Sequence, residues 1–180
     1  MKTAFDKSWT LFLDRDGVIN KKPPNDYVKK WSEFHFIQGV LIALPKLSEI
    51  FNKIIVVTNQ QGVGKGLYTP DDLNTIHSNM LDQIQDAKGR INHIYYCTNL
   101  ASENSLCRKP NTGMAIQAKA DYPEIDFNKS VIVGDSVSDM EFGKKLEMYL
   151  VYIAENNSAL PENLNVDRRV KTLLDWAETL

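Results

Sequence analysis

The sequence predicts an α/β fold of three layers, in which a parallel sheet is covered by helices on both faces. Two observations lead to this prediction. Short apolar runs alternate with amphipathic stretches along the 180 residues. The runs are also apolar throughout, as expected for strands that are buried on both faces. Alternation of such strands with helices is typical of parallel sheets.

Five apolar runs predict the strands of this sheet. They are rich in β-branched and aromatic residues, which favour extended structure. The predicted strands are Trp9–Leu13, Lys53–Thr58, Ile91–Cys97, Ser130–Val133 and Met148–Ile153.

Helical spacing of apolar residues predicts the elements between and after these strands. The clearest helix starts with Thr69 as its N-cap and Pro70 at its first position, and it ends near Gly89. In the stretch 39–51 we expect Pro45 to kink the helix or delay its start. The remaining predicted elements are a helix at 114–120, a helix opened by a capping box at Ser138–Glu141, an amphipathic piece at 170–180 and a loop at 156–166.

Composition narrows the class of protein. Hydrophobic residues make up 43% of the chain and charged residues 24%, which is ordinary for a globular domain and excludes a disordered chain. We therefore expect a single domain over residues 1–180. The net charge of −2 argues against a nucleic-acid partner, and the apolar runs are far shorter than the ~20 residues that span a membrane. Asp6 and Lys7 interrupt any signal peptide, and two cysteines suit a reducing compartment. We expect a cytoplasmic monomer.

Polar residues stand directly after several predicted strands. Asp14 and Asp16 follow the first, Thr58 ends the second, and Asp135 follows the fourth. Ligands of parallel sheets bind at the carboxyl ends of the strands, so we expect these side chains to meet there. Lys109, after the third strand and a loop, adds positive charge.

This set of side chains suits phosphoryl transfer. Asp14, Asp16 and Asp135 offer the hard oxygen atoms that Mg²⁺ accepts. A cation together with Lys109 would neutralise charge that builds up on a phosphate, to which Thr58 could donate a hydrogen bond. One aspartate can act as a nucleophile, and a second one two residues on can transfer protons.

Four ordered motifs resemble those of the haloacid dehalogenase (HAD) superfamily of phosphatases. They are DRDG at 14–17, VTNQ at 57–60, RKP at 108–110 and VGDSVSD at 133–139. The resemblance implies a Rossmann-like fold of HAD type and a Mg²⁺-dependent phosphatase. It makes Asp14 the nucleophile and Asp16 the general acid/base, which also lends its backbone carbonyl to the metal. Thr58 and Lys109 would stabilise the phosphoryl group, and Asp135 would complete the metal site.

Asp139 has two possible roles. The resemblance implies a water-mediated partner of the metal, but an acid at a helix N-terminus can also serve only to stabilise that helix.

Finer features resemble one branch of the superfamily, whose members act on D-glycero-D-manno-heptose 1,7-bisphosphate or on histidinol phosphate. The carrying residues are Arg15 between the two acids, the TNQxG continuation at 58–62 and CRKP at 107–110. The resemblance implies that the substrate, a small phosphorylated metabolite, is bound by Arg15, Asn25, Asn59, Gln60, Gln61 and Arg108.

The chain departs from this branch in its zinc loop. Cys97 and Cys107 remain, but Asn99 and Ser105 stand where His and Cys would be. Structural zinc takes four nitrogen or sulfur ligands, so we expect no zinc. The cysteines then serve as small buried or loop residues, and the loop 98–106 is held by other means or is mobile.

Several alternatives stay open. Ser136 replaces the Lys or Arg usual in the branch, which weakens both exact assignments. We favour the heptose bisphosphate, with histidinol phosphate as the main alternative. TNQQGVGKG and RKPNTGM also resemble polynucleotide 3′-phosphatases, and a binding module without catalysis is a further alternative. The intervals between motifs leave no room for a cap domain, so we expect loops at 21–31, 61–68 and 98–106 to wall the site.

Overall fold

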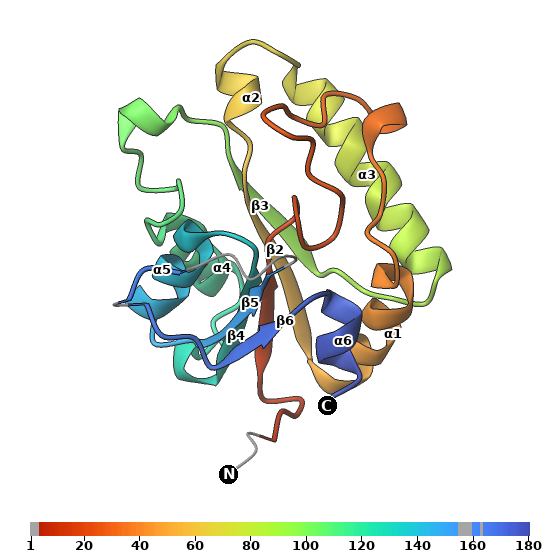
Figure 1. Cartoon of the computed structure of the whole chain (residues 1–180), viewed down its shortest axis with the longest axis vertical. Coiled ribbons are helices and arrows are strands. Elements are labelled where there is room, and N and C mark those ends of the chain that lie inside the picture. Colours follow the sequence, from red (N-terminus) through yellow and green to blue (C-terminus); the bar gives the residue numbers. More distant parts are fainter. Residues whose placement is uncertain (1–3, 155–159, 163) are drawn as a thin grey trace.

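The computed structural model describes residues 4–154, 160–162 and 164–180 of the chain. Within these residues one sheet has the strand order β3-β2-β1-β4-β5-β6, and every neighbouring pair is parallel (Figure 1). The strands are β1 Thr10–Leu13, β2 Lys53–Asn59, β3 His93–Cys97, β4 Ser130–Gly134, β5 Tyr149–Ile153 and β6 Arg168–Val170.

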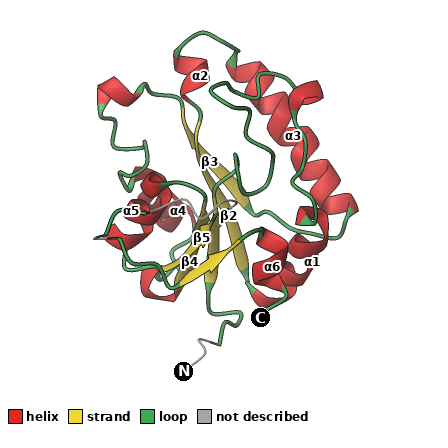
Figure 2. Cartoon of the chain, in the orientation of Figure 1, coloured by secondary structure: helices red, strands yellow, loops and turns green. Residues whose placement is uncertain are grey.

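Helices connect most of the strands and lie against both faces of the sheet (Figure 2). They are α1 Val40–Ile50, α2 Gln61–Gly64, α3 Pro70–Asp86, α4 Gly113–Asp121, α5 Val137–Lys145 and α6 Leu173–Ala177. Short 3₁₀ helices are η1 Trp31–Glu33, η2 Ala101–Glu103 and η3 Phe127–Lys129. The predicted three-layer α/β fold is confirmed.

The two faces of the sheet carry separate cores. Successive side chains of a strand point to opposite faces. In β1, Leu11 and Leu13 therefore pack with α1, α3 and α6, whereas Phe12 packs with α4 and α5. Residues of both cores are almost fully buried, and this burial is the main force that holds the strand ends in place.

Helix α3 begins as the sequence predicts. The Thr69 hydroxyl accepts a hydrogen bond from the Asp72 backbone, and the Asp72 carboxylate accepts one from the Thr69 backbone. Leu73, Ile76 and Met80 then bury one face of the helix. A capped and packed helix of this kind is a rigid support for the residues it carries.

Other boundaries differ from the prediction. Helix α1 starts at Val40 with Pro45 inside it, so the proline does not delay the helix. The cap of α5 is Ser136, two residues before the predicted Ser138, because the Ser136 hydroxyl and Asp139 form the capping box. Strand β6 and helix α2 have no counterpart among the predicted elements. The predicted loop at 156–166 lies partly outside the described residues.

The two cysteines are joined in a disulfide, Cys97 to Cys107. The expectation that the cysteines serve as small buried or loop residues did not include this bond, which joins residues ten apart in sequence where the loop 98–106 folds back on β3. This covalent closure supplies the means of holding the loop that the sequence left open. The absence of zinc stays a prediction.

Short segments stand where a cap domain would be inserted. Among the described residues, η1 and α1 fill the interval between β1 and β2, and α2, α3, β3 and η2 fill the interval from Thr58 to Lys109. No described helix is long and apolar enough to cross a membrane. The carboxyl edge of the sheet is therefore bordered by loops.

Candidate active site

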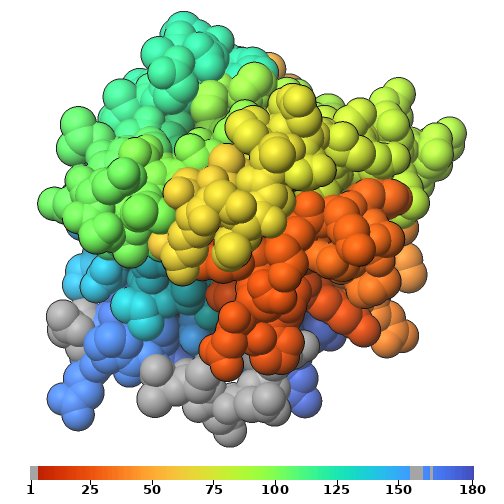
Figure 3. Space-filling model, turned by 90° about the horizontal axis from the view of Figure 1, so that it is seen from above, coloured from red at the N-terminus to blue at the C-terminus, as the bar shows by residue number. Residues whose placement is uncertain are grey.

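A cavity of about 490 Å³ lies at the carboxyl edge of the sheet. Its volume falls within the range usual for small-ligand sites. Its lining includes residues from the segments 22–28 and 58–65 together with Arg108 and Lys109. Seen from above, the first two segments lie side by side (Figure 3). The cavity wall contains most of the predicted site residues: Asp14, Arg15, Asp16, Asn25, Thr58, Asn59, Gln60, Gln61, Arg108, Lys109 and Asp139.

Lys109 is the centre of the buried part of this site. It is 3% exposed, and its Nζ lies 2.9 Å from Asp14 Oδ1 and 2.6 Å from Asp139 Oδ1. Nζ also donates a hydrogen bond to the Val57 carbonyl at 2.7 Å. Burial alone would lower the pKa of Lys109, but the charges of Asp139 and Asp14 outweigh it and raise the pKa above its usual value. The ammonium is therefore a fixed positive charge beside Asp14.

Asp14 directly follows β1 and is largely buried. Burial and the negative charge of Asp139 raise the pKa of Asp14 to about 7, against the opposing effect of Lys109. Its Oδ1 accepts a hydrogen bond from the Arg15 backbone at 2.8 Å in addition to the contact with Lys109. Both contacts engage the same oxygen, so Oδ2 carries the lone pairs that remain for chemistry.

Asp139 holds Lys109 in place and is itself fully buried. Its second oxygen, Oδ2, accepts hydrogen bonds from the backbone and the hydroxyl of Ser136. Asp139 thus caps α5 and lies within the acidic cluster, and its water-mediated role at the metal stays a prediction.

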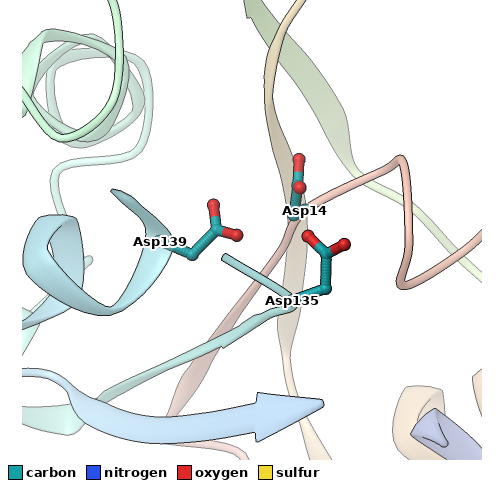
Figure 4. Close-up of side chains that lie close together, drawn as sticks. All are labelled: Asp14, Asp135 and Asp139. Atoms are coloured by element: carbon teal, nitrogen blue, oxygen red, sulfur yellow. The ribbon is translucent and has the colours of Figure 1, made fainter. Parts of the chain in front are cut away.

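Three carboxylates from two strand ends and one helix converge on the same space. One oxygen atom from each of Asp14, Asp135 and Asp139 lies within 4.8 Å of the other two (Figure 4). Asp135 Oδ1 is buried without a hydrogen-bond partner, while Oδ2 lies 3.4 Å from Lys22 Nζ. Burial and the nearby charge of Asp139, opposed by Lys22, raise the pKa of Asp135. An unpartnered carboxylate oxygen in such a cluster fits a divalent cation.

The turn after β1 requires a glycine. Gly17 has a positive φ of 93°, and a Cβ at this position would collide with the carboxylate of Asp135. The glycine of the DRDG motif thus lets the β1 turn approach the carboxylate after β4.

Asp16 lies beside this cluster and is held on both of its oxygens. Oδ1 accepts hydrogen bonds from Arg15 Nη2 and Asn20 Nδ2, both at 2.9 Å. Oδ2 accepts one from Gln60 Nε2 at 2.8 Å. Burial favours the neutral acid, but the Arg15 charge and these hydrogen bonds outweigh it and hold the pKa of Asp16 below its usual range.

Residues at and after the end of β2 form hydrogen bonds with Asp16 and with the backbone of Lys109. Gln60 Nε2 donates to Thr58 Oγ1 at 2.9 Å as well as to Asp16. The Thr58 hydroxyl accepts that bond, so its own proton is available to the cavity. The side chain of Asn59 forms two hydrogen bonds with the backbone of Lys109, at 3.0 and 3.1 Å. Asn59 thereby fixes the turn that presents Lys109.

The outer wall is more exposed and holds separate cations. Arg108 lines the cavity, and its buried Nη1 has no hydrogen-bond partner. Lys65 Nζ and Gln61 Nε2 both donate to the Tyr27 hydroxyl, at 3.0 and 2.8 Å. Asn25, with a positive φ of 55°, forms the exposed tip of the facing loop.

Sequence reasoning did not find every residue of the site. We predicted that Arg15 binds substrate, yet its side chain is 1% exposed and its guanidinium is bonded to Asp16 and His77. His77 was not predicted as a site residue, and Tyr68 was predicted only as the last residue of the wall loop at 61–68. The signal available for His77 was its position beside Ile76 on the apolar face of a helix. The loop that carries Lys22 was expected to wall the site, but nothing in the sequence relates Lys22 to Asp135.

Comparison with known proteins places this geometry among phosphatases. The family model described as "Polynucleotide kinase 3 phosphatase" matches residues 3–166. A D-glycero-alpha-D-manno-heptose-1,7-bisphosphate 7-phosphatase of Mycobacterium tuberculosis is 41% identical over 133 residues, which cover 74% of this chain and 70% of the relative. A D-glycero-beta-D-manno-heptose-1,7-bisphosphate 7-phosphatase of Helicobacter pylori is 30% identical over 169 residues, which cover 92% of this chain and 95% of the relative.

A solved structure also supports the similarity to heptose bisphosphate phosphatases. The crystal structure of a D,D-heptose 1,7-bisphosphate phosphatase from B. bronchiseptica, complexed with magnesium and phosphate, superposes with a TM-score of 0.82. The two sequences are 28% identical, and the match covers 94% of this chain and 97% of that one.

Proposed function

This chain belongs to the HAD superfamily of phosphatases, in the family that the polynucleotide kinase 3 phosphatase model describes, and we propose that it hydrolyses a phosphate ester of a small sugar bisphosphate. The observation that carries this proposal is the pair Asp14 and Asp16 at one strand end, with Lys109 bonded to Asp14. The names of the relatives support D-glycero-D-manno-heptose 1,7-bisphosphate as the substrate.

In the proposed reaction Asp14 Oδ2 attacks phosphorus, and the bond to the leaving oxygen breaks. Asp14 Oδ1 stays held by Lys109 and the Arg15 backbone, so the attacking oxygen is fixed in orientation. Lys109 and the Thr58 hydroxyl offset the charge on the phosphoryl oxygens. The product of this step is an aspartyl-phosphate on Asp14.

Asp16 moves the protons of both steps. It gives a proton to the leaving oxygen and later takes one from the water that hydrolyses the aspartyl-phosphate. The free site favours the ionised form of Asp16. A phosphate dianion beside Asp16 opposes its negative charge and thereby favours the protonated form that the first step needs.

Mg²⁺ fits the carboxylates at the centre of the site. Asp14 and Asp135 would hold it, since Asp135 Oδ1 is buried and unpartnered. The Asp139 oxygens are engaged by Lys109 and Ser136, so Asp139 would act on the ion only through these neighbours or a water. When bound, the ion supplies positive charge that draws the phosphate to Asp14 and stabilises the transferring group.

A second anion could be bound at the outer wall. Arg108 has an unpartnered Nη1, and Lys65 lies on the same cavity wall. A substrate with two phosphates would place one at Asp14 and the other toward these cations, where arginine can bind it with two parallel hydrogen bonds. This separation of charge supports a bisphosphate over a monophosphate such as histidinol phosphate.

A polynucleotide 3′-phosphatase is the second candidate, because the matched family model carries that description. A nucleic-acid strand needs a basic groove and aromatic side chains for its bases. The chain has a net charge of −2, which favours a small metabolite.

One panel of substrates tests these proposals. We would measure kcat/KM with Mg²⁺ for both anomers of the heptose bisphosphate, for histidinol phosphate and for a 3′-phosphorylated oligonucleotide. We expect one heptose anomer to be the best substrate. A preference for the oligonucleotide would replace the proposed substrate by the second candidate, and failure to release phosphate from any ester would overturn both.

A further inference from the structure

The side chain of Arg15 carries a buried positive charge, and the proposed hydrolysis assigns it no role. Burying a guanidinium is costly unless its donors are paired. Nη2 donates to Asp16 Oδ1 at 2.9 Å, and Nη1 lies 3.2 Å from His77 Nε2. The contact with His77 joins residues 62 apart in sequence, one in the turn after β1 and the other in the middle of α3. The guanidinium therefore bridges α3 and Asp16.

His77 acts in this bridge as a neutral acceptor. Burial and the charge of Arg15 lower the pKa of His77 to about 3, so the imidazole is uncharged at neutral pH. Arginine has only donors, and a neutral imidazole has one acceptor nitrogen. Nε2 is therefore that acceptor, and the proton of the ring is on Nδ1.

A second bridge, through Gln60, connects the other oxygen of Asp16 with Tyr68. The hydroxyl of Tyr68, the residue before the α3 N-cap, donates to Gln60 Oε1 at 2.7 Å. Gln60 Nε2 in turn donates to Asp16 Oδ2 at 2.8 Å. Tyr68 is buried, which raises the pKa of its hydroxyl to about 12 and keeps the donated proton in place.

We propose that His77 and Tyr68 are positioning residues, which fix the Asp16 carboxylate through Arg15 and through Gln60. Helix α3 carries His77 and directly follows Tyr68, and it is capped at Thr69 and packed on the core. Each Asp16 oxygen is thus connected, through one intermediate side chain, to helix α3 or to the residue directly before its N-cap. Proton transfer requires the carboxylate to lie within hydrogen-bond distance of the leaving oxygen, so a small rotation of Asp16 is costly.

The inference rests on the proposed role of Asp16 as the general acid, and that role supplies its test. Loss of a well-placed acid slows departure of an alkoxide much more than departure of a nitrophenolate, which leaves without a proton. The value of kcat/KM reports only the steps up to formation of the aspartyl-phosphate. A merely structural defect would lower kcat/KM equally for both kinds of ester.

The experiment compares His77→Leu, His77→Gln and Tyr68→Phe with the unaltered protein. Each is assayed with Mg²⁺ on the best alkyl phosphate of the substrate panel and on p-nitrophenyl phosphate. Ser78→Ala, an exposed change on the same helix, is the matched control. Asp16→Asn provides the reference pattern for a lost acid.

We expect His77→Leu and Tyr68→Phe to lower kcat/KM on the alkyl ester by about 10- to 100-fold and on the nitrophenyl ester by no more than about 3-fold. His77→Gln keeps an acceptor near the position of Nε2 and should restore most of the loss. Equal losses on both esters, or no rescue by glutamine, would overturn the inference. If His77→Leu does not fold, the comparison of the two esters is made with Tyr68→Phe. That variant loses only the hydroxyl that donates to Gln60. Failure of the unaltered protein on every ester would instead overturn the proposed function.

Discussion

The buried and the exposed halves of the cavity are built on different principles. In the buried half, Lys109, Asp14 and Asp139 form a network in which nearly every polar atom has a partner and the side chains have almost no exposed surface. In the exposed half, Arg108 keeps an unpartnered nitrogen and the Lys22 side chain is 55% exposed. The end of β1, helix α5 and the turn held by Asn59 thus fix the groups that suit the chemistry, and more exposed loops hold the groups that suit recognition.

The largest expected effect comes from the nucleophile. Asp14→Asn should lower kcat by about 10³-fold or more, because an amide oxygen does not form the aspartyl-phosphate. Phosphate release from the best substrate measures this. Asp82→Asn, a matched change at an exposed position of α3 away from the cavity, should leave kcat within about 3-fold. Activity of Asp14→Asn near that of the unaltered protein would exclude the covalent mechanism.

Lys109 tests whether the buried network is also a stability element. Lys109→Met leaves Asp14 and Asp139 facing each other without a cation and should lower the free energy of unfolding by about 3–5 kcal/mol. Denaturant unfolding measures this. Adding Asp139→Asn removes one of the two charges and should restore part of the loss. A loss below about 1 kcal/mol in the single variant would contradict the network.

The disulfide anchors the segment that carries residues of both halves of the cavity. Cys107 directly precedes Arg108 of the exposed half and Lys109 of the buried half. Removing a cross-link that closes a loop of this length should lower the free energy of unfolding by about 3 kcal/mol. Cys97→Ser with Cys107→Ser and treatment of the unaltered protein with dithiothreitol should give the same loss. An unfolding curve that is unchanged by either treatment would show that the loop does not depend on the bond.

Arg108 tests the recognition assigned to the exposed half. Arg108→Ala should raise KM for the heptose bisphosphate by about 10- to 100-fold, the usual effect of losing a hydrogen bond to a charged group. KM for p-nitrophenyl phosphate, which has no second phosphate, should change little. Arg168→Ala, at an exposed position of β6, is the matched control. An equal change in KM for both substrates would remove Arg108 from the second-phosphate site.

His77 gives the smallest effect, and it depends on pH. Its pKa is about 3 in the folded protein and near 6.5 in the unfolded chain, so the unfolded state binds the proton more readily. The contribution of His77 to stability is therefore complete above pH 6.5 and is lost as the pH falls, by about 2 kcal/mol at pH 5. His77→Gln should remove this part of the dependence between pH 7 and pH 5. Identical pH dependence in both proteins would contradict the burial of a neutral imidazole.

Sequence reasoning recovered most of the fold because local signals agreed with it. The capping box at Thr69 and the apolar runs of β1, β2, β4 and β5 need no tertiary contact to be recognised. Strand β6 was missed, since Arg168–Val170 is short and mostly exposed and has no apolar run. The cap of α5 was misplaced by two residues because Ser136 and Ser138 both precede acidic residues that could complete the box.

The sequence by itself determined which polar residues meet at the carboxyl edge of the sheet. Carboxyl ends of parallel strands share one edge, so Asp14, Thr58 and Asp135 had to lie together once the strands were recognised. Only the tertiary structure decided where Arg15 points, that Cys97 is bonded to Cys107, and that α3 supports Asp16 through His77. Those contacts join segments far apart in the chain, and their geometry depends on how helices pack on the sheet. Packing of that kind leaves no periodic pattern in the sequence.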